Sequence, residues 1–334
     1  MYEAISNAQK SIYLEMYIFE NDIEEFDFIN LLKSKAELGL EVKLLLDSFG
    51  SADFSRDSVA ELEKSGVEIL IMSYLLHRMH RKVLVVDERI AFIGGVNIHK
   101  ISRLWNDLMV QIKGKLVKKV VTSFAKSYKN AGGKSRELIG KNSRIKAARS
   151  DTWIVEHSPV GKKFYFKRIY QAYLNEAKKS IILITPYFIP KRWLRAALHQ
   201  AVLRGLNVEI LVPKNTDNGF IMNRVNYFYI YKLAKLGIKF YIEPAMNHAK
   251  AIIIDEKEAM VGSQNLDVLS FDFNSEIGIF FKDLGEVSKL SAIAKEWKKN
   301  SVLFDYKTYK PKWFDYILSP LINLFSLFYR IFLD

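Results

Sequence analysis

The chain has 334 residues, of which 49% are hydrophobic and 26% are charged, so it is a folded protein of about two domains and not a disordered, collagen-like or coiled-coil chain. It contains no cysteine, which excludes disulfides, cysteine-ligated metals and thiol nucleophiles. The formal net charge of +13 favours polyanionic partners such as nucleic acid or an anionic membrane surface.

In chain order, the predicted elements occur twice. Each copy reads as a helix end leading into an apolar strand, then a helix, a glycine and a second strand. These stretches are residues 7–14, 28–38 and 40–46 in the first copy, and residues 175–183, 193–203 and 206–212 in the second. A further helix, glycine and strand pattern in residues 62–67 is matched by residues 233–238. The repetition predicts an α/β protein of two similar halves, each with a mostly parallel mixed β-sheet flanked by helices.

A basic stretch separates the two copies. The sequence from Lys113 to Arg149 contains twelve Lys or Arg and one acid, Glu137. Such a charge run fits either a solvated surface or an anion-binding surface. We expect a first half in residues 1–133, a basic link in 134–150, a second half in 151–308 and a C-terminal helix in 309–334.

The most informative pattern is H-x-K-x-x-x-x-D, which occurs once in each half and is followed by an Asn 17 residues after the His. The first copy consists of His80, Lys82, Asp87 and Asn97, and the second of His248, Lys250, Asp255 and Asn265. Because the chain has only six histidines, two copies at one spacing are not expected by chance. The pattern therefore indicates a site that uses both halves.

The residue types in this pattern suit phosphoryl transfer. In a strand, a His and a Lys two residues apart lie on one face. One imidazole can attack phosphorus while a second protonates the leaving oxygen. Lys82, Lys250, Asn97 and Asn265 can hold the non-bridging phosphate oxygens, and no metal or cofactor is expected.

Other polar residues of the pattern are expected to support this site. Each His needs an acceptor on its other ring nitrogen, and Asp107 and Glu276 follow the two Asn residues at 10 and 11 positions. We assign these two carboxylates to orientation of the histidines, and we place Ser263 with them and the two Asn residues among the phosphate-binding or orienting residues. Asp87 and Asp255 belong to the catalytic motif, although capping of a turn at the strand end is favoured over direct catalysis.

The double motif resembles that of the phospholipase D superfamily, and the closest resemblance within it is to bacterial cardiolipin synthases. The stretches that carry it are 78–82 with 93–97, 105–107, 185–190 and 261–267 (which includes Ser263), and 273–276. The resemblance implies two halves about a pseudo-twofold axis with one shared active-site cleft. It implies that His80 becomes a covalent phosphohistidine and that His248 is the general acid and then the base.

The implied reaction is phosphatidyl transfer from phosphatidylglycerol to a second phospholipid, which gives cardiolipin and glycerol. The implied location is the cytoplasmic face of a bacterial cell membrane, with peripheral attachment. Family members commonly carry a transmembrane hairpin ahead of the equivalent of Tyr2, and this sequence begins without one. Two alternatives remain open: a hydrolytic phospholipase D, in which water resolves the intermediate, and a nuclease of the same superfamily.

The C-terminal segment argues against nucleic acid as a partner. From Trp313 to Asp334 the polar residues form one narrow helical stripe, and the rest of the surface is apolar. The polar positions are Asp315, Ser319, Asn323, Ser326, Arg330 and Asp334. We expect this helix to lie in a membrane interface, with packing on the body or on a second copy, and a bilayer span, as the alternatives.

Overall fold

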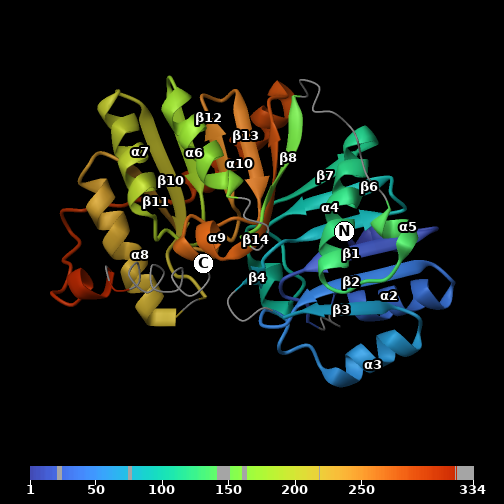
Figure 1. Cartoon of the computed structure of the whole chain (residues 1–334). Coiled ribbons are helices and arrows are strands. Elements are labelled where there is room, and N and C mark those ends of the chain that lie inside the picture. The colour runs from blue at the N-terminus through green and yellow to red at the C-terminus, as the bar shows by residue number, and fades with distance from the viewer. Residues whose placement is uncertain are drawn as a thin grey trace.

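The structure is a computed structural model of the whole chain, and it describes residues 1–20, 25–73, 77–140, 151–159, 164–217, 219–319 and 321. Two α/β halves lie side by side (Figure 1). Each half is built on one β-sheet with helices on both faces. The predicted mixed α/β architecture of two repeats is therefore confirmed.

The first half has a six-stranded sheet in the order β3-β2-β1-β5-β6-β7. Its strands are β1 (Ser11–Met16), β2 (Glu41–Asp47), β3 (Glu68–Met72), β5 (Val83–Val86), β6 (Ile90–Gly94) and β7 (Met109–Lys113). Its helices are α1 (Tyr2–Ser6), α2 (Phe28–Glu37), α3 (Arg56–Lys64), α4 (Val117–Asn130) and α5 (Arg136–Ile139), with the 3₁₀ turns η1 (Lys100–Leu104) and η2 (Gly114–Leu116).

The second half has a sheet in the order β15-β11-β10-β9-β12-β13-β14-β4, to which β8 adds by pairing with β14. Its strands are β8 (Thr152–His157), β9 (Ser180–Ile184), β10 (Asn207–Pro213), β11 (Lys239–Glu243), β12 (Ala251–Ile254), β13 (Glu258–Gly262), β14 (Asn274–Phe281) and β15 (Val302–Leu303), together with β4 (Arg78–Met79) from the first half. Its helices are α6 (Tyr165–Glu176), α7 (Arg192–Leu203), α8 (Gly219–Ala234), α9 (Val268–Asp272) and α10 (Leu284–Lys299).

The share of parallel pairing is smaller than the sequence predicted. Strands β1, β2 and β3 pair in parallel, but β5, β6 and β7 extend the sheet with antiparallel pairs. The reason is a tight hairpin directly after the motif strand, where Asp87 and Glu88 both have positive φ angles of 53° and 54°. The same turn recurs at Asp255 and Glu256 between β12 and β13. A turn this short cannot supply the crossover that parallel pairing requires.

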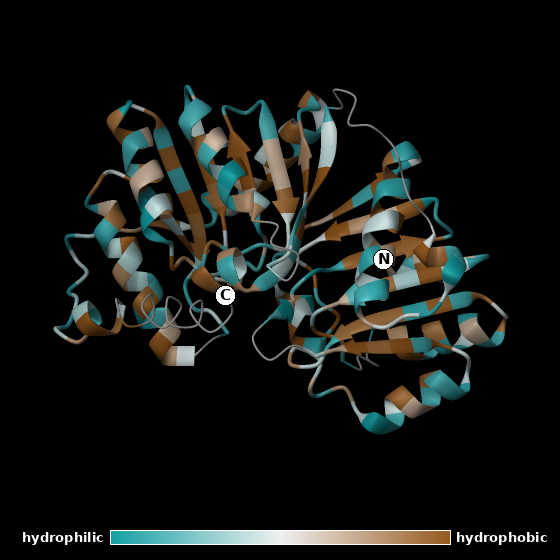
Figure 2. Cartoon of the chain, in the orientation of Figure 1, coloured by the Kyte–Doolittle hydropathy of each residue, from teal (hydrophilic) through white to brown (hydrophobic). Residues whose placement is uncertain are grey.

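The central strands β1, β2 and β10 are buried on both faces, which explains their nearly continuous apolar sequences (Figure 2). In the first half, α1, α2 and α3 cover one face of the sheet and α4 covers the other. In the second half, α6, α7 and α8 cover one face and α10 the other. Ile277 and Ile279 of β14 pack into the core of the first half, so the two sheets share apolar contacts.

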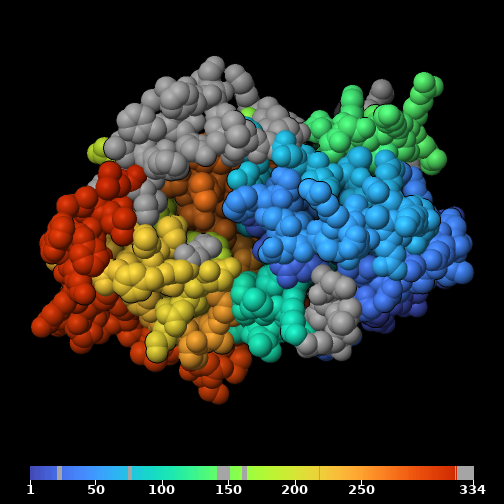
Figure 3. Space-filling model, turned by 90° about the horizontal axis from the view of Figure 1, so that it is seen from below, coloured from blue at the N-terminus to red at the C-terminus, as the bar shows by residue number. Residues whose placement is uncertain are grey.

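Backbone pairing crosses between the halves at both motifs. In the first, β4 pairs in parallel with β14, and the His80 amide donates to the Ser275 carbonyl at 3.0 Å. In the second, Asn247 forms a parallel bridge with Asn106, and the His248 amide donates to the Asn106 carbonyl at 2.7 Å. These two matching exchanges are what a pseudo-twofold axis produces. The teal segment around residue 100 and the yellow α8 lie on facing sides of the seam between the halves (Figure 3).

The C-terminal segment begins with its polar side against the body. Asp315 and Ser319 are each only 2% exposed, and Arg224 of α8 forms an ion pair with Asp315. Trp313 and Ile317 are exposed at 75% and 52%. The start of this segment thus combines packing on the body with an outward apolar side, while residues 322–334 of the predicted helix lie outside the described residues. No helix in the described ranges is sufficiently long and apolar to span a bilayer.

Candidate active site

The structure brings both His–Lys pairs together in one buried site. His80 and His248 are 6% and 4% exposed, and Lys82 and Lys250 are 0% and 1% exposed. Each pair lies in the extended segment just before its strand, β5 or β12, and not within the strand as the sequence predicted. Each lysine folds back, so that its Nζ donates to the backbone carbonyl of the histidine two residues earlier. The ammonium groups are thereby fixed beside the imidazoles.

The carboxylate that orients each histidine comes from the opposite half. Nδ1 of His80 lies 3.0 Å and 3.1 Å from the two carboxylate oxygens of Glu276. Nδ1 of His248 lies 2.8 Å from Oδ2 of Asp107. A proton on Nδ1 in each pair leaves Nε2 as the ring nitrogen available to substrate. The sequence predicted these two carboxylates, but it did not predict the exchange between halves.

The two pairs differ in the polar contacts of their carboxylates. Glu276 accepts a hydrogen bond from Ser263 Oγ and another from Asn274 Nδ2 at 3.3 Å. Although burial acts to raise the pKa of Glu276, the charges of His80 and Lys82 and these hydrogen bonds lower it. Ser263 therefore positions a carboxylate, which is one of the roles expected from the sequence.

Asp107 has fewer such contacts. Its side chain accepts a hydrogen bond from the Leu108 amide at 2.7 Å, and burial raises its pKa to about 6 against the opposing charge of Lys250. Gly95 occupies the position that Ser263 has in the second half, since each lies 15 residues after its motif histidine. A Cβ added at Gly95 would lie 2.3 Å from Oδ1 of Asp107. Glycine is thus required there for the carboxylate to reach His248.

We expect Gly95→Ala to displace Asp107 and to lower kcat by about 10²-fold, because a small error in the position of a catalytic group has an effect of that size. Circular dichroism should show a folded protein. Gly285→Ala in α10 is the matched control, because a Cβ there lies 3.1 Å from Asp283 and has no contact with the site. Wild-type kcat in Gly95→Ala would show that Asp107 does not need its present position.

Burial dominates the electrostatics of the site. It lowers the pKa of His80 despite the charge of Glu276, and burial together with both lysines lowers the pKa of His248 well below its usual value. Burial and Lys250 likewise lower the pKa of Lys82 well below its usual value. A phosphate diester would reverse these shifts, because its negative charge favours the protonated forms. The site is therefore suited to an anion.

The pH dependence follows from Lys250, whose pKa burial lowers from 10.5 to about 8, against the opposing charges of Asp107 and Glu276. We expect kcat/KM to fall above about pH 8, because the free enzyme then loses a phosphate-binding cation. The unfolded chain binds this proton more tightly between pH 8 and 10.5, so the contribution of Lys250 to the free energy of unfolding should rise over that range. Kinetics and chemical denaturation at pH 7, 8, 9 and 10 measure both trends. If kcat/KM and the free energy of unfolding both fell between pH 8 and 10, the assignment of this titration to Lys250 would be contradicted.

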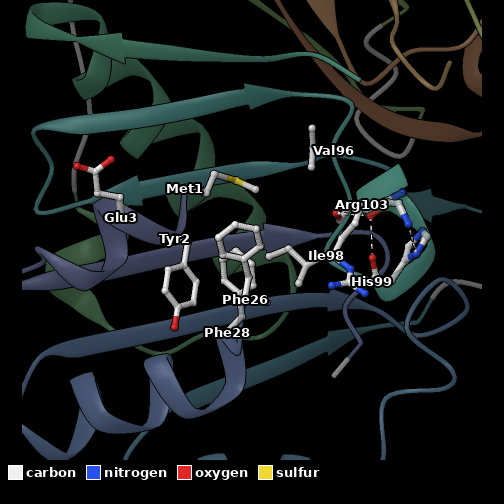
Figure 4. Close-up of a pocket in the computed structure, with 11 residues that line it drawn as sticks. Met1, Tyr2, Glu3, Phe26, Phe28, Val96, Ile98, His99 and Arg103 are labelled. Carbon is white, nitrogen blue, oxygen red and sulfur yellow. Dashed lines mark hydrogen bonds between the residues drawn. The ribbon is translucent and has the colours of Figure 1, made fainter. Parts of the chain in front are cut away.

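Asn97 and Asn265 lie two residues beyond Gly95 and Ser263, and both are 4% exposed. Oδ1 of Asn97 accepts from the Ile18 amide at 3.3 Å, which leaves its amide group as a donor. Oδ1 of Asn265 is buried without a hydrogen-bond partner among the described residues. Asn97 also borders an apolar pocket of about 410 Å³, whose other lining residues include Tyr2, Phe28 and Ile98 (Figure 4).

Asp87 and Asp255 are not part of this site. The Asp87 carboxylate accepts hydrogen bonds from the backbone amides of Gln9, Lys10 and Ser11, and that of Asp255 accepts from those of Lys178, Lys179 and Ser180. Asp87 therefore anchors the loop that leads into β1, and Asp255 anchors the equivalent loop that leads into β9. This placement agrees with the turn-capping interpretation and differs from their grouping with the catalytic residues.

Several aromatic rings contact the histidines, and the sequence analysis did not predict these contacts. The Tyr17 ring lies edge-on to the His80 ring, with 4.6 Å between the ring centroids. The centroids of the Trp105 and His248 rings are 5.4 Å apart. Tyr187 also packs edge-on to His248 at 6.4 Å and donates a hydrogen bond to Asp217. Trp105 and Tyr187 occur in stretches that resemble the cardiolipin synthases, whereas nothing in the sequence distinguishes Tyr17.

Arg81, between His80 and Lys82, is a second residue that was missed. It is 6% exposed, and its Nη2 donates to Ser123 of α4 at 2.6 Å. It also forms ion pairs with Glu15 of β1 at 3.2 Å and with Glu156 of β8 at 3.8 Å. Arg81 thus ties the first motif to both halves. The second motif has Ala249 at the equivalent position. This difference between the two repeats is the signal by which Arg81 could have been identified from the sequence.

Two repeats that contribute equal His–Lys pairs to one shared site define the phospholipase D class of protein. The family described as "Cardiolipin synthase, PLD-like domain" matches residues 1–130 and 170–297. The chain belongs to this family, as the sequence resemblance predicted.

Individual relatives agree with this assignment. The probable cardiolipin synthase YwiE of Bacillus subtilis (strain 168) is 28% identical over 316 residues, covering 89% of this chain and 63% of the relative. A cardiolipin synthase of Clostridium perfringens (strain 13 / Type A) is 30% identical over 341 residues, covering 91% of this chain and 71% of the relative. The chain is therefore shorter than these relatives.

A solved structure supports the fold. The phosphatidylserine synthase of Haemophilus influenzae Rd KW20 superimposes with a TM-score of 0.75 at 13% identity, covering 98% of this chain and 90% of that protein. At this identity the similarity shows that the two proteins share the fold of paired repeats.

Proposed function

We propose that the protein is a phosphatidyltransferase that makes cardiolipin from phosphatidylglycerol and a second phospholipid through a covalent phosphohistidine. The observation that carries this proposal is the pair of exchanged His–carboxylate contacts around two buried lysines. Membership of the cardiolipin synthase family supports the choice of lipid. The residue roles follow from the chemistry of the two histidines.

In the first step, Nε2 of His80 attacks the phosphorus of the donor lipid. The bond from phosphorus to the headgroup glycerol oxygen breaks, and His248 gives its proton to that oxygen. Lys82 and Lys250, with the amides of Asn97 and Asn265, stabilise the charge of the pentacoordinate transition state. Glu276 stabilises the positive charge that develops on His80.

In the second step, the hydroxyl group of the acceptor lipid attacks the phosphohistidine. His248, now neutral, removes the proton of that hydroxyl, and the bond between phosphorus and Nε2 of His80 breaks. The products are cardiolipin and free enzyme. Water at the same place would give phosphatidic acid, so the acceptor alone separates the transferase from the hydrolytic alternative.

We also propose that the protein works as a peripheral protein on the cytoplasmic face of a bacterial cell membrane. The net charge of +13 supports attachment to anionic lipid, and the apolar exposed side of the C-terminal segment supports contact with the interface. We retain the sequence-based division into halves within the basic link, residues 134–150, although its first part forms α5 and packs on the first half.

The decisive experiment is mass analysis of the products that the purified protein forms from phosphatidylglycerol vesicles. Cardiolipin and glycerol in equal amounts support the transferase. Phosphatidic acid without cardiolipin would replace it with the hydrolase. Turnover of a nucleic acid with no reaction on lipid would support the nuclease and overturn the proposal.

A further inference from the structure

Loops around the site carry large apolar side chains that face solvent. The exposed fractions are 64% for Phe49, 63% for Ile101, 86% for Leu104, 74% for Phe220, 57% for Ile221 and 56% for Leu269. We call these six residues the apolar rim. Exposed apolar side chains gathered around one site mark an interaction surface, whereas scattered ones need no explanation.

On the side of the first half, two loops connect the apolar rim to the histidines. Leu104 ends η1 and precedes Trp105, whose ring contacts His248 at 5.4 Å. The Phe49 ring lies 4.3 Å from the guanidinium carbon of Arg78, two residues before His80. The apolar rim therefore begins within one or two residues of the groups that border the site.

The second half contributes in the same way. Phe220 and Ile221 form the first turn of α8, directly after the loop of Asp217. Asp217 accepts the hydrogen bond from Tyr187, whose ring contacts His248. Figure 3 shows the start of α8 facing the segment around residue 100 across the seam.

The pseudo-twofold relation extends to the rim. Ile101 lies four residues after Asn97, and Leu269 lies four residues after Asn265. Both repeats thus place an exposed aliphatic side chain at one equivalent position beside the site. Ser102 and Arg103, which lie between Ile101 and Leu104 in η1, also line the apolar pocket that Asn97 borders (Figure 4).

Charge indicates what covers this surface. The exposed Lys100 directly precedes Ile101, the exposed Lys214 lies in the segment before α8, and the site itself contains the buried Lys82 and Lys250. An apolar border with cations beside it and within it complements an amphiphile with an anionic head. A soluble protein that bound to the apolar rim would have no reason to place a negative charge at the buried Lys82 and Lys250.

The start of the C-terminal segment is attached to the same helix. Arg224 lies one turn beyond Phe220 and Ile221 on α8 and forms the ion pair with the buried Asp315. Ile317 and Leu321 of this segment are each 52% exposed. Exposed apolar side chains therefore occur both at the first turn of α8 and at the start of the C-terminal segment that α8 holds.

We propose that the apolar rim is the surface by which the protein docks on an anionic lipid bilayer, so that a phospholipid enters the site without passing through water. Its phosphate moves inward to Lys82 and Lys250, while its acyl chains stay among the rim side chains. This inference rests on the proposed lipid substrate. It adds the orientation of the protein: the site faces the bilayer.

Because the chain has no cysteine, single labels can be placed cleanly. Leu104→Cys and Phe220→Cys, each carrying an environment-sensitive fluorophore, are mixed with phosphatidylglycerol vesicles. We expect a blue shift at both positions and quenching by nitroxide groups on the acyl chains. Leu38→Cys is the matched control, because Leu38 is 73% exposed at the end of α2 and outside the rim. Equal responses at all three positions, or none at the rim positions, would overturn the inference.

A second measurement uses serine variants. Ile101→Ser with Leu104→Ser should weaken vesicle binding by at least about tenfold, since two apolar side chains leave the interface. Hydrolysis or transfer of a short-chain phosphatidylglycerol below its micelle concentration should change less than about twofold. Leu38→Ser with Leu203→Ser, which removes equally exposed side chains elsewhere, should leave both unchanged. If the labelled rim residues entered the bilayer but the protein were inactive on every lipid, the proposed function would be refuted and the docking surface would be retained.

Discussion

His80→Asn will abolish phosphatidyl transfer, with a loss of at least about 10⁴-fold, because the proposed mechanism assigns the bond to phosphorus to His80 and proton transfer to His248. His248→Asn will be equally inactive on phosphatidylglycerol, but it will still form the covalent intermediate from a donor with a nitrophenol leaving group. That leaving group departs without a proton, so the general acid is not needed. Acid quench, digestion and mass mapping should place the phosphoryl group on the peptide that contains His80.

His199→Asn in α7 is the control for removal of an imidazole outside the site. It should retain wild-type rates on both donors. A covalent intermediate in His80→Asn, with none in His248→Asn, would reverse the two roles. The geometry alone does not favour that reversal, since the better-satisfied carboxylate, Glu276, pairs with His80.

Glu276→Gln will slow formation of the intermediate from the nitrophenyl donor by about 10²- to 10⁴-fold, because an amide neither fixes the His80 tautomer nor stabilises its positive charge. Asp107→Asn will leave this step nearly unchanged and slow turnover of phosphatidylglycerol by a similar factor. The reason is that Asp107 contacts His248, which only the natural leaving group requires. Rapid-quench measurements of the covalent intermediate separate the two cases.

Glu63→Gln, on the exposed side of α3, tests the general effect of removing a carboxylate and should match the wild type. If Asp107→Asn slowed the first step and Glu276→Gln did not, each carboxylate would serve the histidine of its own half. The exchange seen in the structure would then have no catalytic meaning.

Much of the fold could be predicted from the sequence because the chain repeats itself. The helix at 28–38 and the helix at 193–203 correspond closely to α2 (Phe28–Glu37) and α7 (Arg192–Leu203). The motif strands β5 (Val83–Val86) and β12 (Ala251–Ile254) were also predicted correctly. Each follows from a local pattern of apolar residues with a glycine at a helix end, and local patterns are what a sequence displays.

The arrangement of the site could be predicted only in part, because it depends on contacts between distant segments. The sequence suggested that Glu276 and Asp107 orient histidines. The histidine that each contacts is distant in the chain: His80 is 196 residues from Glu276, and His248 is 141 residues from Asp107. The extra antiparallel pairing was missed because Asp87 and Glu88 give no sign of the positive φ that makes the hairpin. Of the predicted C-terminal polar stripe, only Asp315 and Ser319 lie in the described residues, and the sequence did not show that Asp315 pairs with Arg224, in another helix.

The exchanged carboxylates have a consequence for how such a protein can arise. Neither half contains a complete histidine–carboxylate pair, so an ancestral chain of one repeat would need a second copy to form either pair. A symmetric dimer of that ancestor would hold two identical pairs in one site. Joining the two genes would keep the site at every stage and then let the copies diverge. The present difference between Glu276 with Ser263 and Asp107 with Gly95 is one that two identical copies could not encode, and it would let one histidine specialise in attack and the other in proton transfer, as we propose.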